Sequence, residues 1–387
     1  MSIFLARALE IKNEMIENRR FLHRNAEIRD DLPITADYVK KQLIKTGIEP
    51  VEICKNGIVA LIGKKQGKTV MLRADMDALD MKENSGLPFS SQTPYAHCCG
   101  HDLHIAMLLG AAKILKEREH ELNGVVKLMF QPGEEYFIGS KAMLDAGLLE
   151  NPKVHVAVDM HVNAGNHVGT VAICKGYTCA SCDGMKLIVN GKGCHGAWPH
   201  NGIDPINVAA HIYLSLQALI ARETPPDLTA TLTFGQFAGG NAANIIPSQV
   251  VMQGTMRTFD RDLRAKLSGR VREIVDCTAK AFGASVDYEV LSDVPALITN
   301  PELLDEMLGY LADLGVEFIP YPQSSASDDF ARISEQVPSV FFSLGCRPDG
   351  DGPVYPAHNP KIIFNEDALP IGAALHAQCA YHYLKNH

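Results

Sequence analysis

The hydrophobic pattern of the chain alternates between short apolar runs and helical stretches. Strand-like runs end near Ile62, Ala74, Gln131 and His161, and an apolar helical pattern covers residues 103–116. An amphipathic helical pattern precedes the first of these strands. Strands that alternate with helices are typical of a mostly parallel sheet covered by helices. The first half of the chain therefore predicts an α/β fold.

The pattern changes near residue 184 and returns near residue 296. Between these positions the order is a strand, a helical pattern at 205–221, two long strands at 228–237 and 249–258, a helical pattern at 261–281 and a last strand. This order predicts an α+β unit inserted into the larger one. A chain of 387 residues also exceeds what one core normally supports. We expect a discontinuous larger domain at 1–183 and 296–387 and an inserted domain at 184–295.

Composition and charge restrict the functional classes. With 46% hydrophobic and 21% charged residues the chain can bury sizeable cores. The net charge of −9, without a Lys or Arg cluster, argues against nucleic-acid and anionic-membrane partners. The first residues form no apolar stretch typical of a signal peptide or a membrane span. We therefore expect a soluble cytoplasmic protein, and its ten scattered cysteines are expected to be reduced.

Two adjacent acids, Glu134 and Glu135, follow the apolar run 125–130. Neighbouring carboxylates repel unless a cation binds one of them. Ligands bind at the carboxyl ends of strands in open α/β sheets, so the pair is expected at a ligand site. A metal ion could bind one carboxylate while the other acts as a base.

A dense group of metal-binding side chains lies upstream, between residues 95 and 104. This segment contains three histidines, two cysteines and an acid. Cys99 and His101 are one residue apart, so in an extended loop both would point the same way and share an ion. Asp102 is expected near a helix start, where it could cap the helix instead of binding metal.

Other strand ends carry the same kinds of side chain. Asp75 and Asp77 end one apolar run, His161 ends another, and His358 lies in a proline-rich loop. Several such ends indicate one rim of one sheet, and imidazole, thiolate and carboxylate groups bind zinc- or manganese-like ions. The sequence therefore predicts a divalent-metal site on that rim.

Two further motifs are interpreted as chance. Cys174, Cys179 and Cys182 have the spacing of plant-type iron–sulfur proteins, but strand-like flanks and a long chain argue against a cluster. Residues 191–196 match G-x-G-x-x-G, yet Trp198 and Pro199 block the helix that a dinucleotide site requires.

The ordered set of motifs resembles the peptidase M20 family of metal-dependent amidohydrolases, most closely its N-acyl-amino-acid, hippurate and indoleacetyl-amino-acid hydrolases. The resemblance covers nearly the whole chain. The matching segments are Arg73–Leu79, His97–His104, Phe130–Glu135, Asp159–His161, Gly193–His200, Asn244–Pro247, Gly254–Arg257, Ser327–Phe330 and Ala357–Pro360.

The resemblance implies a role for each matching residue. Glu134 is implied as the general base acting on a metal-bridged water. His195 is implied to polarise the substrate carbonyl, often across a dimer interface, and Asn244 and Arg257 to bind the carboxylate side of the substrate. The inserted domain is implied to serve as a lid and dimerisation surface. The implied ligands of two metal ions are Cys99, His101, Glu135, His161 and His358.

The expected activity is hydrolysis of the amide bond of an N-acyl amino acid or a related small amide. Two alternatives stay open: a metallo-dipeptidase or aminopeptidase with the same centre, and a non-catalytic metal-dependent binding protein. Zinc or manganese is the expected ion, and nickel or cobalt also suits the ligands. The expected partners are a small-molecule substrate and further copies of the chain in a homodimer or larger homo-oligomer, with neither nucleic acid nor membrane.

Overall fold

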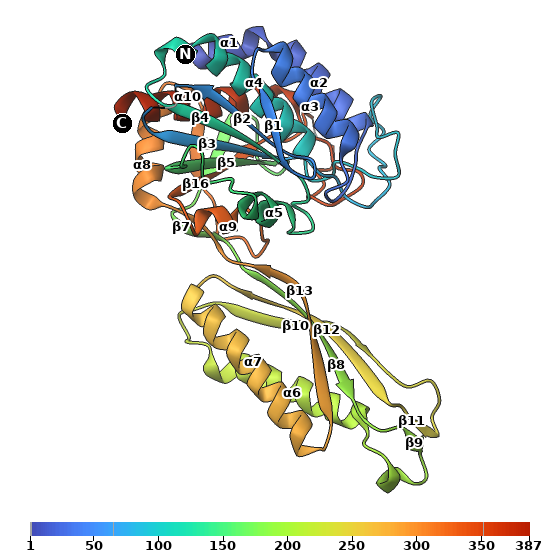
Figure 1. Cartoon of the computed structure of the whole chain (residues 1–387). Helices are drawn as coiled ribbons and strands as arrows, with labels where there is room; N and C mark the ends of the chain where they lie inside the picture. Colours follow the sequence, from blue (N-terminus) through green and yellow to red (C-terminus); the bar gives the residue numbers. More distant parts are fainter. Residues whose placement is uncertain (1, 65, 351) are drawn as a thin grey trace. The chain divides into compact units, whose positions relative to one another are not determined.

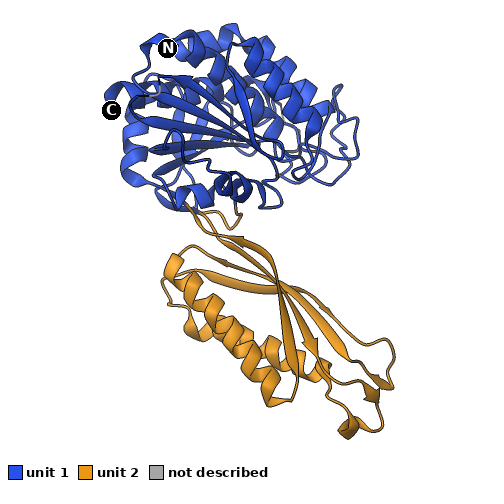
Figure 2. Ribbon diagram, in the orientation of Figure 1, with its two compact units in different colours: residues 1–178, 298–322, 328–387 blue, residues 179–297, 323–327 orange. Residues whose placement is uncertain are grey.

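The computed structural model describes residues 2–64, 66–350 and 352–387, which form two compact units. Unit 1 comprises residues 1–178, 298–322 and 328–387, and unit 2 comprises residues 179–297 and 323–327 (Figure 2). The described boundaries lie within a few residues of the expected 183/184 and 295/296, but a five-residue segment at 323–327 also belongs to unit 2. The lid and dimerisation roles of unit 2 stay predictions.

Unit 1 is built on an eight-stranded sheet (Figure 1). In spatial order its strands are β1 (Pro50–Cys54), β2 (Gly57–Gly63), β4 (Val125–Gln131), β3 (Thr69–Asp75), β5 (Val156–Asn163), β16 (Ser339–Gly345), β6 (Thr170–Ile173) and β15 (Glu317–Pro320). The central strands β4, β3, β5 and β16 pair in parallel. β1, β2 and β6 make antiparallel pairs. The sheet is thus mixed, with the expected parallel centre.

Helices cover both faces of this sheet (Figure 1). α4 (His101–Glu117) and α10 (Leu369–Asn386) pack against β3 on one face, and α3 (Pro33–Lys45) lies beside α4 against β1 and β2. α1 (Ile3–Glu10) and α2 (Lys12–Arg24) form an outer layer on α4 and α10. α5 (Gly139–Asp145) and α9 (Ala331–Ser334) lie on the other face, and α8 (Pro301–Tyr310) contacts β16. β3, β4 and β16 are buried along their whole length, which explains their continuous apolar patterns.

Unit 2 has its own hydrophobic core. Its antiparallel sheet has the order β10 (Ala230–Ala238), β12 (Gln249–Thr258), β8 (Cys182–Asn190) and β13 (Ser285–Val294). α6 (Pro205–Glu223) and α7 (Arg261–Ala281) pack against this sheet and each other. Two short strands, β9 (Cys194–His195) and β11 (Ile245–Ile246), pair separately. The predicted α+β character is confirmed.

Several smaller elements differ from expectation. The single N-terminal helix is two, because α1 ends at Glu10 and α2 starts at Lys12, and α3 was not predicted. The strand-like run that ends near Ile62 belongs to a hairpin of β1 and β2 with a turn at Asn56. β7 (Gly176–Cys179) and β14 (Leu297–Thr299) form another short pair. Within the described residues, no helix has the length and apolarity needed to cross a membrane.

Candidate metal centre

The metal-binding side chains gather at the carboxyl ends of the central parallel strands of unit 1. β3 ends at Asp75, β4 ends three residues before Glu134, and β5 carries His161 close to its end. This is the rim where open α/β sheets bind ligands. The structure brings together all six unit 1 residues in question: Cys99, His101, Glu134, Glu135, His161 and His358.

Cys99 and His101 meet through a tight turn, so the predicted extended loop was wrong. Gly100 has a left-handed backbone with φ of 94°, and α4 begins at His101. A Cβ at this glycine would lie 2.4 Å from Cγ2 of Val162 and 3.2 Å from Cζ of Phe364. Both the backbone and the space therefore favour glycine. The turn, not strand alternation, brings the two donors to one place.

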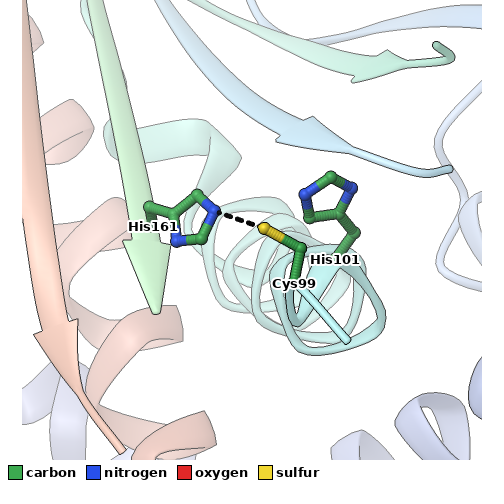
Figure 3. A group of neighbouring side chains, drawn as sticks. All are labelled: Cys99, His101 and His161. Atoms are coloured by element: carbon green, nitrogen blue, oxygen red, sulfur yellow. Dashed lines mark hydrogen bonds between the residues drawn. The ribbon is translucent and has the colours of Figure 1, made fainter. Parts of the chain in front are cut away.

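One group of three donors consists of Cys99, His101 and His161 (Figure 3). Sγ of Cys99 lies 3.3 Å from Nε2 of His161. Two ligands bound to one zinc ion are about 3.5 Å apart, because each metal–ligand bond is about 2.1–2.3 Å long. Nδ1 of His161 donates to the carbonyl of Val162 at 2.8 Å, which leaves Nε2 with a free lone pair.

A second group shares Cys99 and adds Glu135 and His358. Nε2 of His358 lies 3.3 Å from Oε1 of Glu135, and Nε2 of His101 lies 3.8 Å from the same oxygen. His358 has a φ of 63°, and its N–H donates to the carbonyl of Cys98 at 3.0 Å. Two overlapping groups of donors that share one thiol have the arrangement expected for a pair of ions.

Glu134 and Glu135 lie in a turn, not at the end of the strand. β4 ends at Gln131, and the turn continues through Gly133, whose φ is 62°. Asp77 holds this turn: Oδ1 accepts the N–H of Glu134 at 2.9 Å, and Oδ2 accepts that of Glu135 at 3.2 Å. The turn, held by Asp77, therefore brings both carboxylates close to His101: Oε2 of Glu134 lies 4.0 Å and Oε1 of Glu135 lies 3.8 Å from its Nε2.

His104 belongs to the same cluster but is occupied by the protein. Its Nδ1 contacts Oδ1 of Asp75 at 2.5 Å, and its Nε2 accepts the N–H of Val162 at 3.0 Å. Both ring nitrogens thus have partners. His104 supports β3 and β5, and sequence reasoning had assigned it no separate role.

A buried arginine lies beneath the turn and binds four carboxylates. Arg73 is 1% exposed and pairs with Asp75 and Asp159 at 2.9 Å, Asp328 at 3.3 Å and Asp329 at 3.4 Å. One guanidinium faces four acids, and burial raises the pKa of Asp159 and, to about 7, that of Asp329. Sequence reasoning matched these segments to a family but did not predict this network, since the network joins three segments that are far apart in the chain.

The electrostatics of the centre fit a bound cation. Burial and the charges of Glu135, Glu134 and Asp75 raise the pKa of Cys99 well above its usual value. Burial opposes the charged form of His101, but the carboxylates of Asp75, Asp77 and Glu135 raise its pKa to about 10. A thiol among buried acids becomes a thiolate only if positive charge is supplied.

The pKa values of His161, Glu134 and Glu135 are shifted in different directions. Burial and nearby His104 lower the pKa of His161 to about 4, which keeps it neutral as a ligand must be. Burial and the charges of Asp328, Glu135 and Asp329 raise the pKa of Glu134. Burial also acts on Glu135, but His358 and His101 lower its pKa.

Unsatisfied buried atoms test whether a metal fits. Within the described residues, both ring nitrogens of His101 are buried without a hydrogen-bond partner. Such groups are costly unless they bind an ion or water. Their donor types suit zinc or manganese, so the residues present fit divalent metal ions.

The remaining predicted residues belong to unit 2, and the structure separates them within it. Ile245 pairs with His195 in the β9–β11 ladder, and the carbonyl of Asn244 accepts the N–H of Gly196 at 2.7 Å. Gln249 begins β12 three residues after β11 ends, so it marks the end of β12 that is nearest in sequence to Asn244. Arg257 lies eight residues further along β12, about 26 Å away at the usual rise of a strand. It donates to Ser327. His195 and Asn244 thus lie together, and Arg257 does not join them.

The two motifs interpreted as chance lie at the start of unit 2 and in the segment that leads into it. Within the described residues, no close group of potential metal ligands includes Cys174, Cys179 or Cys182. Gly191 and Gly193 lie between β8 and β9, Gly196 follows β9, and α6 begins only at Pro205. All ten cysteines are in the described part of the chain, and none forms a disulfide.

A parallel-centred sheet with carboxylates, imidazoles and a thiol at its carboxyl rim has the fold and the donor set of an α/β protein with a metal site. Comparison with known proteins then gives the family. Residues 71–382 match the model of peptidase family M20/M25/M40. The protein belongs to this family and is a metal-dependent hydrolase of amide bonds.

Relatives whose names give different substrates align with nearly the whole chain. Thermostable carboxypeptidase 2 of Saccharolobus solfataricus is 36% identical, over 96% of this chain and 95% of its own. IAA-amino acid hydrolase ILR1-like 2 of Arabidopsis thaliana is also 36% identical, over 98% and 87%. N-acetyl-L-cysteine deacetylase of Bacillus subtilis is 34% identical, over 93% and 85%.

Solved structures have the same fold over the full length. A crystal structure from methicillin-resistant Staphylococcus aureus matches with a TM-score of 0.93 and 31% identity, over 99% of both chains. The YXEP protein of Bacillus subtilis, a dinuclear metal binding peptidase from the M20 family, matches with a TM-score of 0.82 and 29% identity, over 97% of this chain and 99% of its own.

Proposed function

We propose that the protein removes the acyl group from N-acyl amino acids or related small amides, using two divalent ions held by Cys99, His101, Glu135, His161 and His358. The observation that carries this proposal is the pair of donor groups that share Cys99. Relatives named for N-acetylcysteine and IAA–amino acid substrates support an N-acyl amino acid. The proposed ions are zinc or manganese.

Divalent ions in this centre would polarise the amide carbonyl and lower the pKa of the attacking water. Glu134 is the general base. Its Oε2 lies 4.0 Å from Nε2 of His101, close to the donors without belonging to either group that contains Cys99. It takes the proton of the water and returns it to the leaving amine. Asp77 fixes the backbone of this residue, and so the direction of its side chain.

The separation within unit 2 supports a homodimer as the working form. His195 is the proposed carbonyl-polarising group: its Nδ1 accepts the N–H of Ala197 at 3.0 Å, so its proton is on Nε2. Asn244 and Arg257 are the proposed contacts of the substrate carboxylate. A small N-acyl amino acid cannot span the distance along β12, so one site would take Arg257 from one chain and the His195 end from another.

The Glu134→Gln variant tests the proposed base. The amide keeps the shape but cannot accept the proton, so kcat should fall by about a thousandfold or more. Both metal ions should stay bound, because the proposed ligands are untouched. The measurement is kcat on a panel of N-acyl amino acids at full metal occupancy, with metal content determined on the same samples.

The matched control is Glu150→Gln, an exposed acid in the loop before β5. Its kcat should equal that of the unmodified protein. Full activity in Glu134→Gln would exclude this residue as the base. Absence of hydrolysis by the unmodified protein on every amide tested, with metal at full occupancy, would instead favour a metal-dependent binding protein.

A dipeptide substrate is the second candidate, favoured by the relatives named carboxypeptidase. A dipeptide and an N-acyl amino acid both carry a free carboxylate one residue from the scissile amide, so the same contacts would bind them. They differ by a charged amine on the acyl side. Comparing kcat/KM for N-acetyl amino acids with that for dipeptides of the same C-terminal residue decides between them.

A further inference from the structure

A buried charge network lies directly behind the ligand segment. Arg19 and His23 are one turn apart on α2, and both contact the same oxygen of Asp102. Nε of Arg19 donates to Oδ2 at 2.7 Å, and Nδ1 of His23 lies 2.8 Å from it. The three side chains are at most 5% exposed. Asp102 directly follows His101, so these contacts fix the first turn of α4.

The other ring nitrogen of His23 contacts a second carboxylate. Its Nε2 lies 3.1 Å from Oε1 of Glu83, in the long loop between β3 and α4. The next residue of that loop, Asn84, donates its N–H to the carbonyl of Pro360 at 2.7 Å. Pro360 is two residues from His358. One imidazole therefore connects the segment of His101 to the segment of His358.

Both contacts of His23 are to acids, which only a doubly protonated ring can satisfy. Burial works against this charge, but Asp102 and Glu83 raise the pKa of His23. His97 is the other titratable ring beside it, 6.3 Å away between ring centres. The rest of the network is balanced, since the arginines at 19 and 20 both bind Glu366. Three cations face three acids.

We propose that His23 is a positioning residue for the metal centre. It joins the turn that carries His101 to the loop that supports His358, so that the donors of the two groups stay at ligand distance. It touches none of the proposed ligands. The inference rests on the proposed function only in taking His101 and His358 as ligands.

The His23→Gln variant tests this role through metal affinity. Glutamine can bond to one carboxylate but cannot carry the charge that holds both. Residues that orient ligands from behind typically change metal affinity by about 10- to 100-fold. The dissociation constant for Zn²⁺, measured on metal-free protein by competition with a chromophoric chelator, should rise by about tenfold or more. Thermal unfolding of the same metal-free samples gives the accompanying loss of stability.

The matched control is His155→Gln. His155 directly precedes β5, at the end of that strand opposite to His161. Nδ1 of His155 accepts the N–H of Thr69 at 3.0 Å, so this variant also loses a histidine contact within unit 1. Its Zn²⁺ affinity should stay within about twofold of the unmodified value. An unchanged affinity in His23→Gln, with lowered stability, would show a merely structural residue and overturn the proposal.

The Glu83→Gln variant decides the matter if His23→Gln does not fold. It leaves the pair of His23 and Asp102 intact and weakens only the link to the loop. Affinity about threefold weaker or more supports the proposal, and an unchanged affinity overturns it. An unmodified protein that binds no Zn²⁺ would overturn the proposed function and this inference together. If the unmodified protein and Glu83→Gln bind Zn²⁺ equally well, the role of His23 is overturned and the proposed function stands.

Discussion

Gly100 illustrates how one residue sets the geometry of the centre. Its left-handed backbone places Cys99 and His101 on the same side, and Val162 and Phe364 fill the space where a side chain would be. Gly86 also has a positive φ, of 76°, but no described atom lies within 4 Å of its would-be Cβ. Substitutions at Gly86 and Gly100 can therefore distinguish the cost of a left-handed backbone from the added cost of steric conflict.

We expect Gly100→Ala to lose about 2–4 kcal/mol in the free energy of unfolding of metal-free protein. About 1–2 kcal/mol comes from the left-handed backbone and the rest from the contact with Val162. Gly86→Ala should lose only the backbone cost of about 1–2 kcal/mol. Urea denaturation of both variants gives the comparison. Equal losses would mean that the crowding at Gly100 relaxes without cost.

At the scale of single residues, the types of donor could be predicted and their partners could not. Donor type and spacing indicated Cys99 as a candidate ligand, whereas the assignment of Glu135 and His358 came from the resemblance to the family. Nothing local in the sequence shows that Asp77 accepts two N–H groups of the turn, or that both nitrogens of His104 are taken. These contacts join segments far apart in the chain.

At the scale of elements, the periodicity of apolar residues was sufficient to predict the limits of long helices and strands. The strand expected at 249–258 has those limits, and α7 covers the expected 261–281. The missed α3 buries a narrow stripe that includes Thr35 and a small alanine, which gives a weak apolar signal. The four-residue strands β6 and β7 are too short to show a period.

The contact between α2 and the long loop predicts an acid-dependent stability. Burial opposes ionisation of Glu83, but His23, Ser85 and the N–H of Ser91 lower its pKa to about 2. A lowered pKa means that the unfolded chain binds the proton first as pH falls. The stabilisation is present above about pH 4.5 and is lost progressively as the pH falls towards 2. Its size should be about 2 kcal/mol.

Urea denaturation of metal-free protein between pH 3 and 7 measures this effect. Glu83→Gln should unfold with a shallower dependence on pH than the unmodified protein below pH 4.5. Glu302→Gln, an exposed acid in the first turn of α8, serves as the control and should keep the original slope. Parallel curves for Glu83→Gln and the unmodified protein would contradict the prediction.

At the scale of the whole molecule, the two units have separate cores and only one carries the proposed ligands. The return of the α/β pattern near residue 296 made the insertion predictable. The transfer of residues 323–327 to unit 2 was not, because it depends on contacts such as that of Ser327 with Arg257 and the carbonyl of Ala180. Metal removal should therefore act unequally on the chain.

Chelation should loosen unit 1 and leave unit 2 unchanged. An ion that binds only the folded state at about 100 times its dissociation constant adds about 2.7 kcal/mol, and the excess of buried acids around Arg73 is exposed to self-repulsion when it leaves. Hydrogen exchange followed by mass spectrometry should show faster exchange in the turn at 132–138 and the start of α4. Peptides from β8 and β12 should exchange at the same rate with and without EDTA. Equal acceleration in both units would mean that they unfold as one cooperative body, despite their separate cores.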